Sequence, residues 1–424
     1  MRRTEVQALG QLAGEALAQG GALVEQLHTG IAERAFSHTP AAAPVRLVHD
    51  GVARAVYAGV RGALRGAALA GAQFASRQAP CDGAPLSAQP RAAFALGALN
   101  GFYGDRVSRQ IPELALGMEI RRHGAAVELE PGPLSDAFPD ASERIAVFVH
   151  GLCETDDAWR LVARRAERSD HRSYGARLRD DLGYTPVYVR YNTGLHVSDN
   201  GRSLAAMLER LVEGWPVPCR EIVLVGHSMG GLVARSACHY GERDGMAFAS
   251  AVRHVFCLGT PHLGADLEKG ANALAWALAR VPETRALAGV LNARSAGIKD
   301  LRYGSCVEED WCDCDPDEFL RDRCRETPFL PDAHYYFIGA TLSPAPLGRL
   351  LGDLLVRMPS ASGRGNGRGR RIPFEVDHGH ELAGVNHLEL LGHPAVYEQL
   401  ARWLTAAQSE RPALRAASSS RPVR

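Results

Sequence analysis

No apolar run in this sequence is long enough to cross a membrane. The longest runs, "GAALAGAQFA" and "AAFALGALNGF", fall well short of the about 20 residues that a membrane-spanning helix requires. The first segment, "MRRTEVQALGQLAGEALAQG", also lacks the continuous apolar region of a secretory signal peptide, because polar and acidic residues interrupt it. The sequence therefore predicts a cytoplasmic protein, and peripheral contact with a membrane surface remains open.

The chain also has no surplus of either charge, because its 48 lysine and arginine residues balance its 48 aspartate and glutamate residues. Proteins that bind nucleic acid use a positive surface to neutralise phosphate groups. A formal net charge of zero provides no such overall field, so we expect no nucleic-acid partner. Neither charge nor composition indicates an oligomeric state.

Cysteine is too sparse for a scaffold held together by disulfides, with nine residues in a chain of 424. Four of them gather in "SCVEEDWCDCDPDEFLRDRC", at Cys306, Cys312, Cys314 and Cys324. Their spacing differs from that of paired zinc ligands, so we expect unpaired thiols, with a disulfide or redox pair as the alternative. The same segment lacks the glycine and the final glutamate of a calcium-binding loop. We predict neither a metal ion nor a cofactor.

Residues 1–120 contain helix-like segments rich in small residues, such as residues 49–78, which precede a break at "APCDGAPLSAQP". Alanine and glycine every three or four residues allow helices to approach closely. We interpret this region as a helical accessory layer packed on the rest of the protein. The alternatives are a helix on a membrane surface and a contact in a dimer.

From residue 121 to about 407, apolar strands alternate with amphipathic helices, which is typical of a mostly parallel sheet with helices on both faces. In the helix predicted over "NGRSLAAMLERLVEGW", Leu204, Leu208 and Leu211 share one face. The last predicted helix, "HPAVYEQLARWL", has the same arrangement. The predicted strands cover residues 144–151, 185–192, 221–228, 254–260, 335–341 and 372–376.

Residues 264–333 separate two of these strands by far more than a usual connection. Insertions of this length in a compact domain are usually functional or mobile. We interpret this one as a lid or cap over a site at the edge of the sheet. The polar, proline-bearing residues 408–424 predict a disordered tail.

The segment "EIVLVGHSMGGLVARSACHYG", residues 221–241, joins a buried strand to a helix through Gly226-His227-Ser228-Met229-Gly230. This is a G-x-S-x-G nucleophile elbow in its expected context of strand, turn and helix. A side chain at position 226 or 230 would collide with neighbouring backbone in so tight a turn. We therefore predict that Ser228 is a nucleophile, which needs a base to accept its proton.

Two further segments supply the partners that such a serine requires. Asp353 follows the predicted strand 335–341 and His387 precedes the last helix, so the order Ser, Asp, His matches this class of fold. We predict that His387 shuttles the proton and that Asp353 orients its imidazole. The alternatives for the base are His378, His380 and His393, and those for the acid are Asp266, Asp332 and Asp377.

In "VFVHGLCET" the first predicted strand ends in His150-Gly151, and a loop follows from Leu152. Such a loop can present a backbone N–H to a developing oxyanion, and Met229 at the start of the helix after Ser228 can present the second. We interpret His150 as a structural residue of the loop. His227 and His262 are interpreted as packing or supporting residues.

The set "VFVHGL", "VGHSMGG", "CLGTPHLG", "GDLLV…SA" and "VNHLELL" resembles the lipase-like branch of the α/β-hydrolase superfamily. It is similar to bacterial triacylglycerol lipases and to the group related to glycosylphosphatidylinositol inositol-deacylase, over about residues 144–407. The resemblance implies the α/β-hydrolase fold and the N–H groups of Leu152 and Met229 as oxyanion-hole donors. The bacterial lipases have their acid in "DG-x-V", whereas Asp353 is followed here by Leu-Leu-Val. In some of them an acidic residue at the position of Glu389 binds calcium.

We therefore expect a serine hydrolase that cleaves carboxylic esters, with small-molecule or lipid-like acyl esters as substrates, through an acyl-enzyme intermediate. A phospholipase, a thioesterase or an acyltransferase would use the same nucleophile and oxyanion site. The alternative from another class is a non-catalytic lipid-binding or membrane-surface module. In that case the N-terminal helical region and the arginine-rich residues 363–371 would be the working parts.

Overall fold

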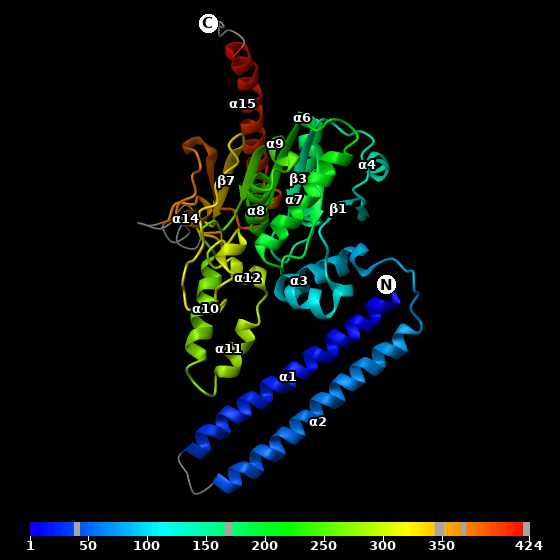
Figure 1. The fold of residues 1–424 in the computed structure, drawn as a ribbon, viewed down its shortest axis with the longest axis vertical. Helices are drawn as coiled ribbons and strands as arrows, with labels where there is room; N and C mark the ends of the chain where they lie inside the picture. Colours follow the sequence, from blue (N-terminus) through cyan, green and yellow to red (C-terminus); the bar gives the residue numbers. More distant parts are fainter. Residues whose placement is uncertain (38–42, 166–171, 344–351, 354, 366–369, 419–424) are drawn as a thin grey trace.

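The computed structural model describes residues 1–418 except for 38–42, 166–171, 344–351, 354 and 366–369 (Figure 1). Among the described residues, eight strands form one sheet in the order β2-β1-β4-β3-β5-β6-β7-β8. Neighbouring strands from β4 through β3 to β8 are parallel, whereas β1 pairs antiparallel with β2 and β4. The expected mostly parallel sheet is confirmed. Its strands are β1 Glu119–Arg122, β2 Ala125–Val127, β3 Arg144–Val149, β4 Thr185–Arg190, β5 Glu221–His227, β6 Val252–Leu258, β7 His334–Thr341 and β8 Gly379–Ala383.

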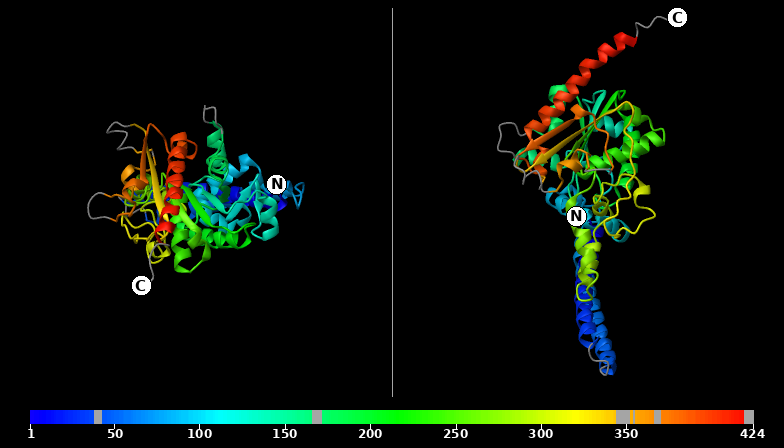
Figure 2. Two further views of the ribbon diagram at one scale, coloured as in Figure 1. Left: turned by 90° about the horizontal axis from the view of Figure 1, so that it is seen from above. Right: turned by 90° about the vertical axis from the view of Figure 1, so that its left-hand side faces the viewer.

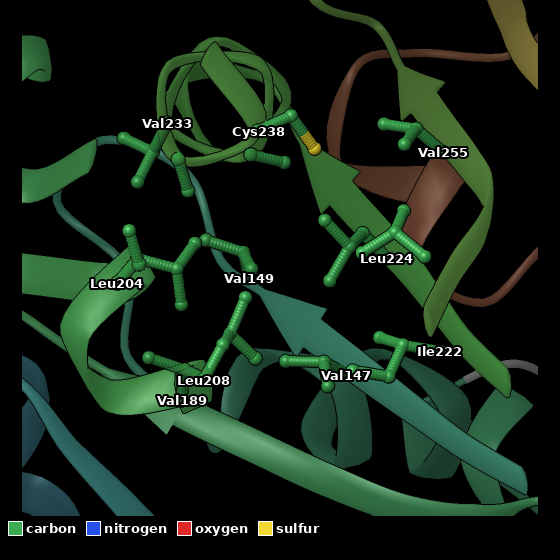
Figure 3. Packing of buried hydrophobic residues seen from close by; sticks show 14 of the residues in the cluster. Val147, Val149, Val189, Leu204, Leu208, Ile222, Leu224, Val233, Cys238 and Val255 are labelled. Atoms are coloured by element: carbon green, nitrogen blue, oxygen red, sulfur yellow. The ribbon is translucent and has the colours of Figure 1, made fainter. Parts of the chain in front are cut away.

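Helices cover both faces of this sheet, which explains why every residue of β5 is buried. On one face, Leu204 and Leu208 of α7 (Val197–Gly214) pack against Val147, Val149 and Val189 of the strands, as Figure 3 shows. Helix α8 (Met229–Arg243) lies beside α7. On the other face, α6 (Tyr174–Leu182) and α15 (Pro394–Ser418) contribute to a second buried cluster. The shorter helices are α4 Pro131–Ala137, α5 Ala158–Arg165, α9 Ala247–Ala251 and α14 Met358–Ala361.

The N-terminal region is helical, as expected. Helices α1 (Arg3–Ser37) and α2 (Ala43–Ser76) form an antiparallel hairpin that extends away from the sheet (Figures 1 and 2). In the part of the chain that the structure describes, neither these helices nor any other is long and apolar enough to span a membrane.

Helix α3 (Pro90–Gln110) packs directly on the sheet domain. A Cβ atom at Gly101 would lie 2.3 Å from the Cys153 sulfur, and one at Gly104 would lie 1.9 Å from the Asn192 amide oxygen. Only glycine permits so close an approach. The division into an accessory region 1–120 and a domain 121–407 remains a prediction, but α3 lies on the N-terminal side of that boundary and is in tight contact across it.

The long connection between β6 and β7 contains α10 Asp266–Leu278, α11 Arg285–Asn292 and α12 Ala296–Asp300. Helices α10 and α11 project from the carboxyl edge of the sheet toward α1 (Figure 1). The four clustered cysteines follow α12, and all four are free thiols in the structure.

Two segments differ from the sequence-based prediction. A strand was expected at residues 372–376, but β8 begins later, at Gly379. Pro373 cannot donate a hydrogen bond to a sheet, whereas Gly379 fits opposite Phe337 of β7, where a Cβ atom would be 2.3 Å from the aromatic ring. In addition, α15 continues to Ser418, so it extends into residues 408–424, where a disordered tail was predicted.

Candidate active site

Ser228 lies in the turn between β5 and α8, at the carboxyl edge of the sheet. Its φ of 51° is in a region that residues other than glycine rarely adopt, so the turn stores backbone strain. A Cβ atom at Gly226 would lie 2.5 Å from the backbone nitrogen of Gly231, and one at Gly230 would lie 2.2 Å from the Val149 oxygen. The two flanking glycines therefore let the chain turn tightly and present the serine.

His387 and Asp353 are in direct contact. Nδ1 of His387 donates a hydrogen bond to Oδ2 of Asp353 at 2.6 Å, and both side chains are buried. The other carboxylate oxygen of Asp353 accepts the backbone N–H groups of Leu355 and Val356 at 3.0 and 2.8 Å. These bonds fix the carboxylate, which in turn fixes the tautomer and the orientation of the imidazole.

The second nitrogen of this imidazole has a different environment. Nε2 of His387 is buried and has no hydrogen-bond partner among the described residues. His387 and Ser228 line the same cavity. A buried histidine nitrogen without a partner is unusual in a folded protein, and it is the atom through which a general base would act.

The loop after β3 runs against the serine. A Cβ atom at Gly151 would lie 3.0 Å from Cβ of Ser228. Within the described residues, neither the Leu152 N–H nor the Met229 N–H donates to another group of the protein. His150 is fully buried and stacks on Tyr191 with ring centroids 4.4 Å apart. Burial lowers the pKa of His150, so its contacts are those of a neutral structural residue.

Glu154 is a residue of this site that the sequence did not reveal. Its carboxylate accepts the Gly151 N–H at 2.7 Å and lies 3.0 Å from Nδ1 of His227. Burial alone would lower the pKa of His227, but the charge of Glu154 and its hydrogen bond raise that pKa above the ordinary value. Burial opposes the charge of Glu154 as well, yet His227 holds the Glu154 pKa below its usual range. The sequence signal was weak, because many acidic residues occur in loops.

His227 extends this network to the segment that carries His387. Its Nε2 lies 3.0 Å from the backbone oxygen of His387, to which it donates a hydrogen bond. The expectation that His227 supports its surroundings agrees with these contacts. His262 is also buried, with Nδ1 3.1 Å from a guanidinium nitrogen of Arg235, and burial lowers its pKa strongly.

A cavity of about 260 Å³ opens beside Ser228. Its walls include residues of α3 and of two helices in the long connection between β6 and β7. Phe102 belongs to α3, Leu267 to α10 and Ile298 to α12. Most of the lining is apolar, and the complete set is Phe102, Leu152, Glu154, Ser228, Pro261, Ala265, Leu267, Glu268, Ala271, Arg294, Ile298, Leu301, Leu355, Val356, His387 and Leu388.

None of the other candidates for the base and the acid lines the cavity beside Ser228. His378 contacts Glu375, and Asp266 forms an ion pair with Arg357. Glu389 accepts the Asn386 N–H at 2.8 Å and belongs to no group of metal-ligand side chains among the described residues. His380, His393, Asp332 and Asp377 are not among the residues that line the cavity.

Residues 140–313 match the family described as the PGAP1-like alpha/beta domain. This segment contains the loop after β3, the nucleophile elbow and the first helices of the long connection, and it ends before Asp353. No curated protein matches the chain significantly.

Several solved structures resemble parts of the chain. The lipase BlEst2 of Bacillus licheniformis in its mature form is 21% identical to this chain, with a TM-score of 0.38. The alignment covers 60% of this chain and 90% of the lipase chain. The lipase of Staphylococcus hyicus is 14% identical to this chain, with a TM-score of 0.34. That alignment covers 66% of this chain and 98% of the lipase chain. Such low scores add nothing about the substrate.

The classification rests instead on this chain's own architecture and on the family match. A parallel sheet is covered on both faces, and a strained serine stands between its central strand and a helix. The segment that contains strands β3 to β6 and this serine matches the PGAP1-like alpha/beta domain. Residues 140–313 therefore match this domain, and the chain has the α/β-hydrolase fold.

Proposed function

We propose that the protein is a serine hydrolase that cleaves carboxylic esters with an apolar acyl group. The observation that carries this proposal is the buried pair of His387 and Asp353, whose hydrogen bond is 2.6 Å long. The other imidazole nitrogen of His387 has no partner among the described residues, and His387 lines the same cavity as Ser228. This arrangement supports a triad in which each member has one role.

In the first half of the reaction, Oγ of Ser228 attacks the ester carbonyl while Nε2 of His387 accepts the serine proton. The imidazolium that forms is stabilised by Asp353. The carbonyl oxygen becomes an oxyanion, which the N–H groups of Leu152 and Met229 stabilise by hydrogen bonding. His387 then returns the proton to the leaving alcohol, and the acyl group remains on Ser228.

In the second half, a water molecule gives its proton to His387 and attacks the carbonyl carbon of the acyl-enzyme. The oxyanion that forms is stabilised by the same two N–H groups. The acid product leaves and Ser228 recovers its proton. The walls formed by Phe102, Ile298 and Leu301 favour an apolar acyl chain, because a polar chain would lose its hydration there without finding hydrogen-bond partners. A lipid-like ester is the substrate class that fits this lining.

A panel of p-nitrophenyl esters from acetyl to palmitoyl, together with phospholipids and acyl-CoA, tests the proposal and separates it from phospholipase or thioesterase activity. Addition of an acceptor alcohol detects acyl transfer. Ser228→Ala should lower kcat on the order of 10⁶-fold and should abolish labelling by a fluorophosphonate probe. Wild-type protein that reacts with neither esters nor the probe would point to the non-catalytic lipid-binding module instead.

A further inference from the structure

Two histidines and a glutamate meet at the amino edge of the sheet, on the side opposite to Ser228. His334 is the first residue of β7, and Glu375 and His378 lie just before β8. In the part of the chain that the structure describes, this is the one group of three such residues whose ligand atoms lie within 4.8 Å of one another. No step of the proposed hydrolysis involves them.

The distances in this group are close to those of a metal site. Nδ1 of His334 is 3.8 Å from one carboxylate oxygen of Glu375, and Nε2 of His378 is 3.7 Å from the other. Ligand atoms at about 2.0 to 2.1 Å from a tetrahedral zinc ion are about 3.4 Å apart. The Glu375 side chain is 67% exposed, so little packing opposes the shifts of a few tenths of an ångström that its two contacts need to reach that separation.

The neighbours of His378 hold it in the form that binds a metal. Its Nδ1 donates a hydrogen bond to the backbone oxygen of Tyr335 at 3.2 Å. A carbonyl oxygen can only accept, so in the neutral imidazole the proton is on Nδ1 and Nε2 carries a free lone pair toward Glu375. Histidines that bind metals almost always donate their other N–H in this way.

The segment that carries Glu375 and His378 is also fixed by its surroundings. The indole N–H of Trp403 donates to the backbone oxygen of Asp377 at 3.1 Å. The ring of His378 lies against that of Tyr336, with centroids 4.2 Å apart. Two of the three side chains therefore come from a short turn anchored to α15, and the third comes from a strand of the sheet.

We propose that His334, Glu375 and His378 bind one zinc ion, with water in the fourth position. Two imidazoles and one carboxylate suit zinc and similar transition metals, whereas calcium and magnesium require mostly oxygen ligands. The ion would join the start of β7 to the turn before β8. Its role is to stabilise this side of the sheet, because Ser228 stands at the opposite edge.

Isothermal titration of the protein with zinc chloride tests this site, using protein without a polyhistidine tag. Wild-type protein should bind one equivalent, and its Tm should rise with zinc concentration because only the folded state presents the three ligands together. His378→Ala should abolish the binding. Glu375→Gln, at an exposed position, should keep the fold and weaken binding clearly, because a neutral amide is a poorer zinc ligand than a carboxylate.

Two control variants test whether zinc binds at neighbouring side chains instead. His380→Asn alters a nearby histidine outside the group and should leave binding unchanged. Cys312→Ser combined with Cys314→Ser and Cys324→Ser removes the thiols that could compete, and it should also retain the site. Cobalt(II) should give a visible spectrum of tetrahedral type without a thiolate charge-transfer band.

Failure of wild-type protein to bind zinc, or equal binding by wild type and His378→Ala, would overturn the proposal. Loss of binding in the triple cysteine variant would overturn it too. The test is independent of catalysis, because Ser228→Ala should bind zinc as wild type does whether or not the protein hydrolyses esters.

Discussion

The carboxylate of Glu154 lies 3.0 Å from Nδ1 of His227, the residue that immediately precedes Ser228. Glu154 also accepts the N–H of Gly151, and His227 donates to the backbone oxygen of His387. One ion pair, in which His227 is fully buried and Glu154 is 12% exposed, thus connects the loop after β3, the nucleophile elbow and the segment of the proposed base. Its removal should affect the relative positions of all three.

Glu154→Gln should keep the shape of the side chain but leave His227 without a charged partner. We expect kcat to fall about tenfold with little change in KM, because glutamine keeps the size of the side chain that lines the cavity while the lost charge loosens the groups that position the reaction. Ester hydrolysis by purified variant and wild type measures this. An unchanged kcat would show that the ion pair does not position the site.

The same pair should make stability depend on pH. The Glu154 pKa is lowered in the folded protein, so its contribution is present above the ordinary value of 4.5 and is lost as pH falls through the lowered pKa. The His227 pKa is raised, so its contribution is present below 6.5 and is lost as pH rises through the raised pKa. The difference in the free energy of unfolding between wild type and Glu154→Gln should therefore be largest, about 3 kcal/mol, between pH 4.5 and pH 6.5. Urea unfolding over a pH series measures it, and a difference that does not vary with pH would contradict the ion pair.

Asp353→Asn tests the proposed acid. The amide can still accept from Leu355 and Val356, but it no longer stabilises the imidazolium and can favour the wrong tautomer of His387. We expect kcat to fall by about 10⁴-fold with the fold retained, as judged by circular dichroism. Asp377→Asn, at an exposed alternative acid, is the matched control and should retain activity; the reverse result would move the acid to position 377.

Phe102 should influence the choice of acyl chain. Phe102→Ala removes part of the apolar cavity wall, so kcat/KM should fall several-fold for long-chain esters and little for the acetyl ester. Phe94→Ala is a matched control, because Phe94 lies on the same helix, is exposed and does not line the cavity. Equal effects of the two variants across the ester panel would remove Phe102 from the binding site.

The contact between α3 and the sheet domain should contribute to the free energy of unfolding. Gly104→Ala places a methyl group against Asn192 and should lower the free energy of unfolding by about 2 kcal/mol. Gly59→Ala, in α2, meets nothing within 4 Å and should be neutral or stabilise the helix by up to about 1 kcal/mol. Chemical unfolding of both variants provides the comparison. If Gly104→Ala left the free energy of unfolding unchanged, α3 would not pack as described.

Several features were predicted from sequence because their causes are local. The run of apolar residues before Gly226 predicted a buried strand, and the two glycines around Ser228 predicted the tight turn, since both depend on backbone sterics within a few residues. The last strand was misplaced for a reason of longer range. Pro373 lies in an apolar run, but the pairing is decided by which residue fits against Phe337 of β7, and that residue is Gly379.

By itself, the sequence determined the elbow, the alternation of strands and helices, and the order in which Ser228, Asp353 and His387 occur. Tertiary structure alone decided that Glu154 faces His227, that α3 supplies a wall of the cavity, and that His334 meets Glu375 and His378. The physical reason is that short-range conformation follows from neighbouring residues, whereas contacts between distant residues depend on strand register and on how helices pack over the sheet.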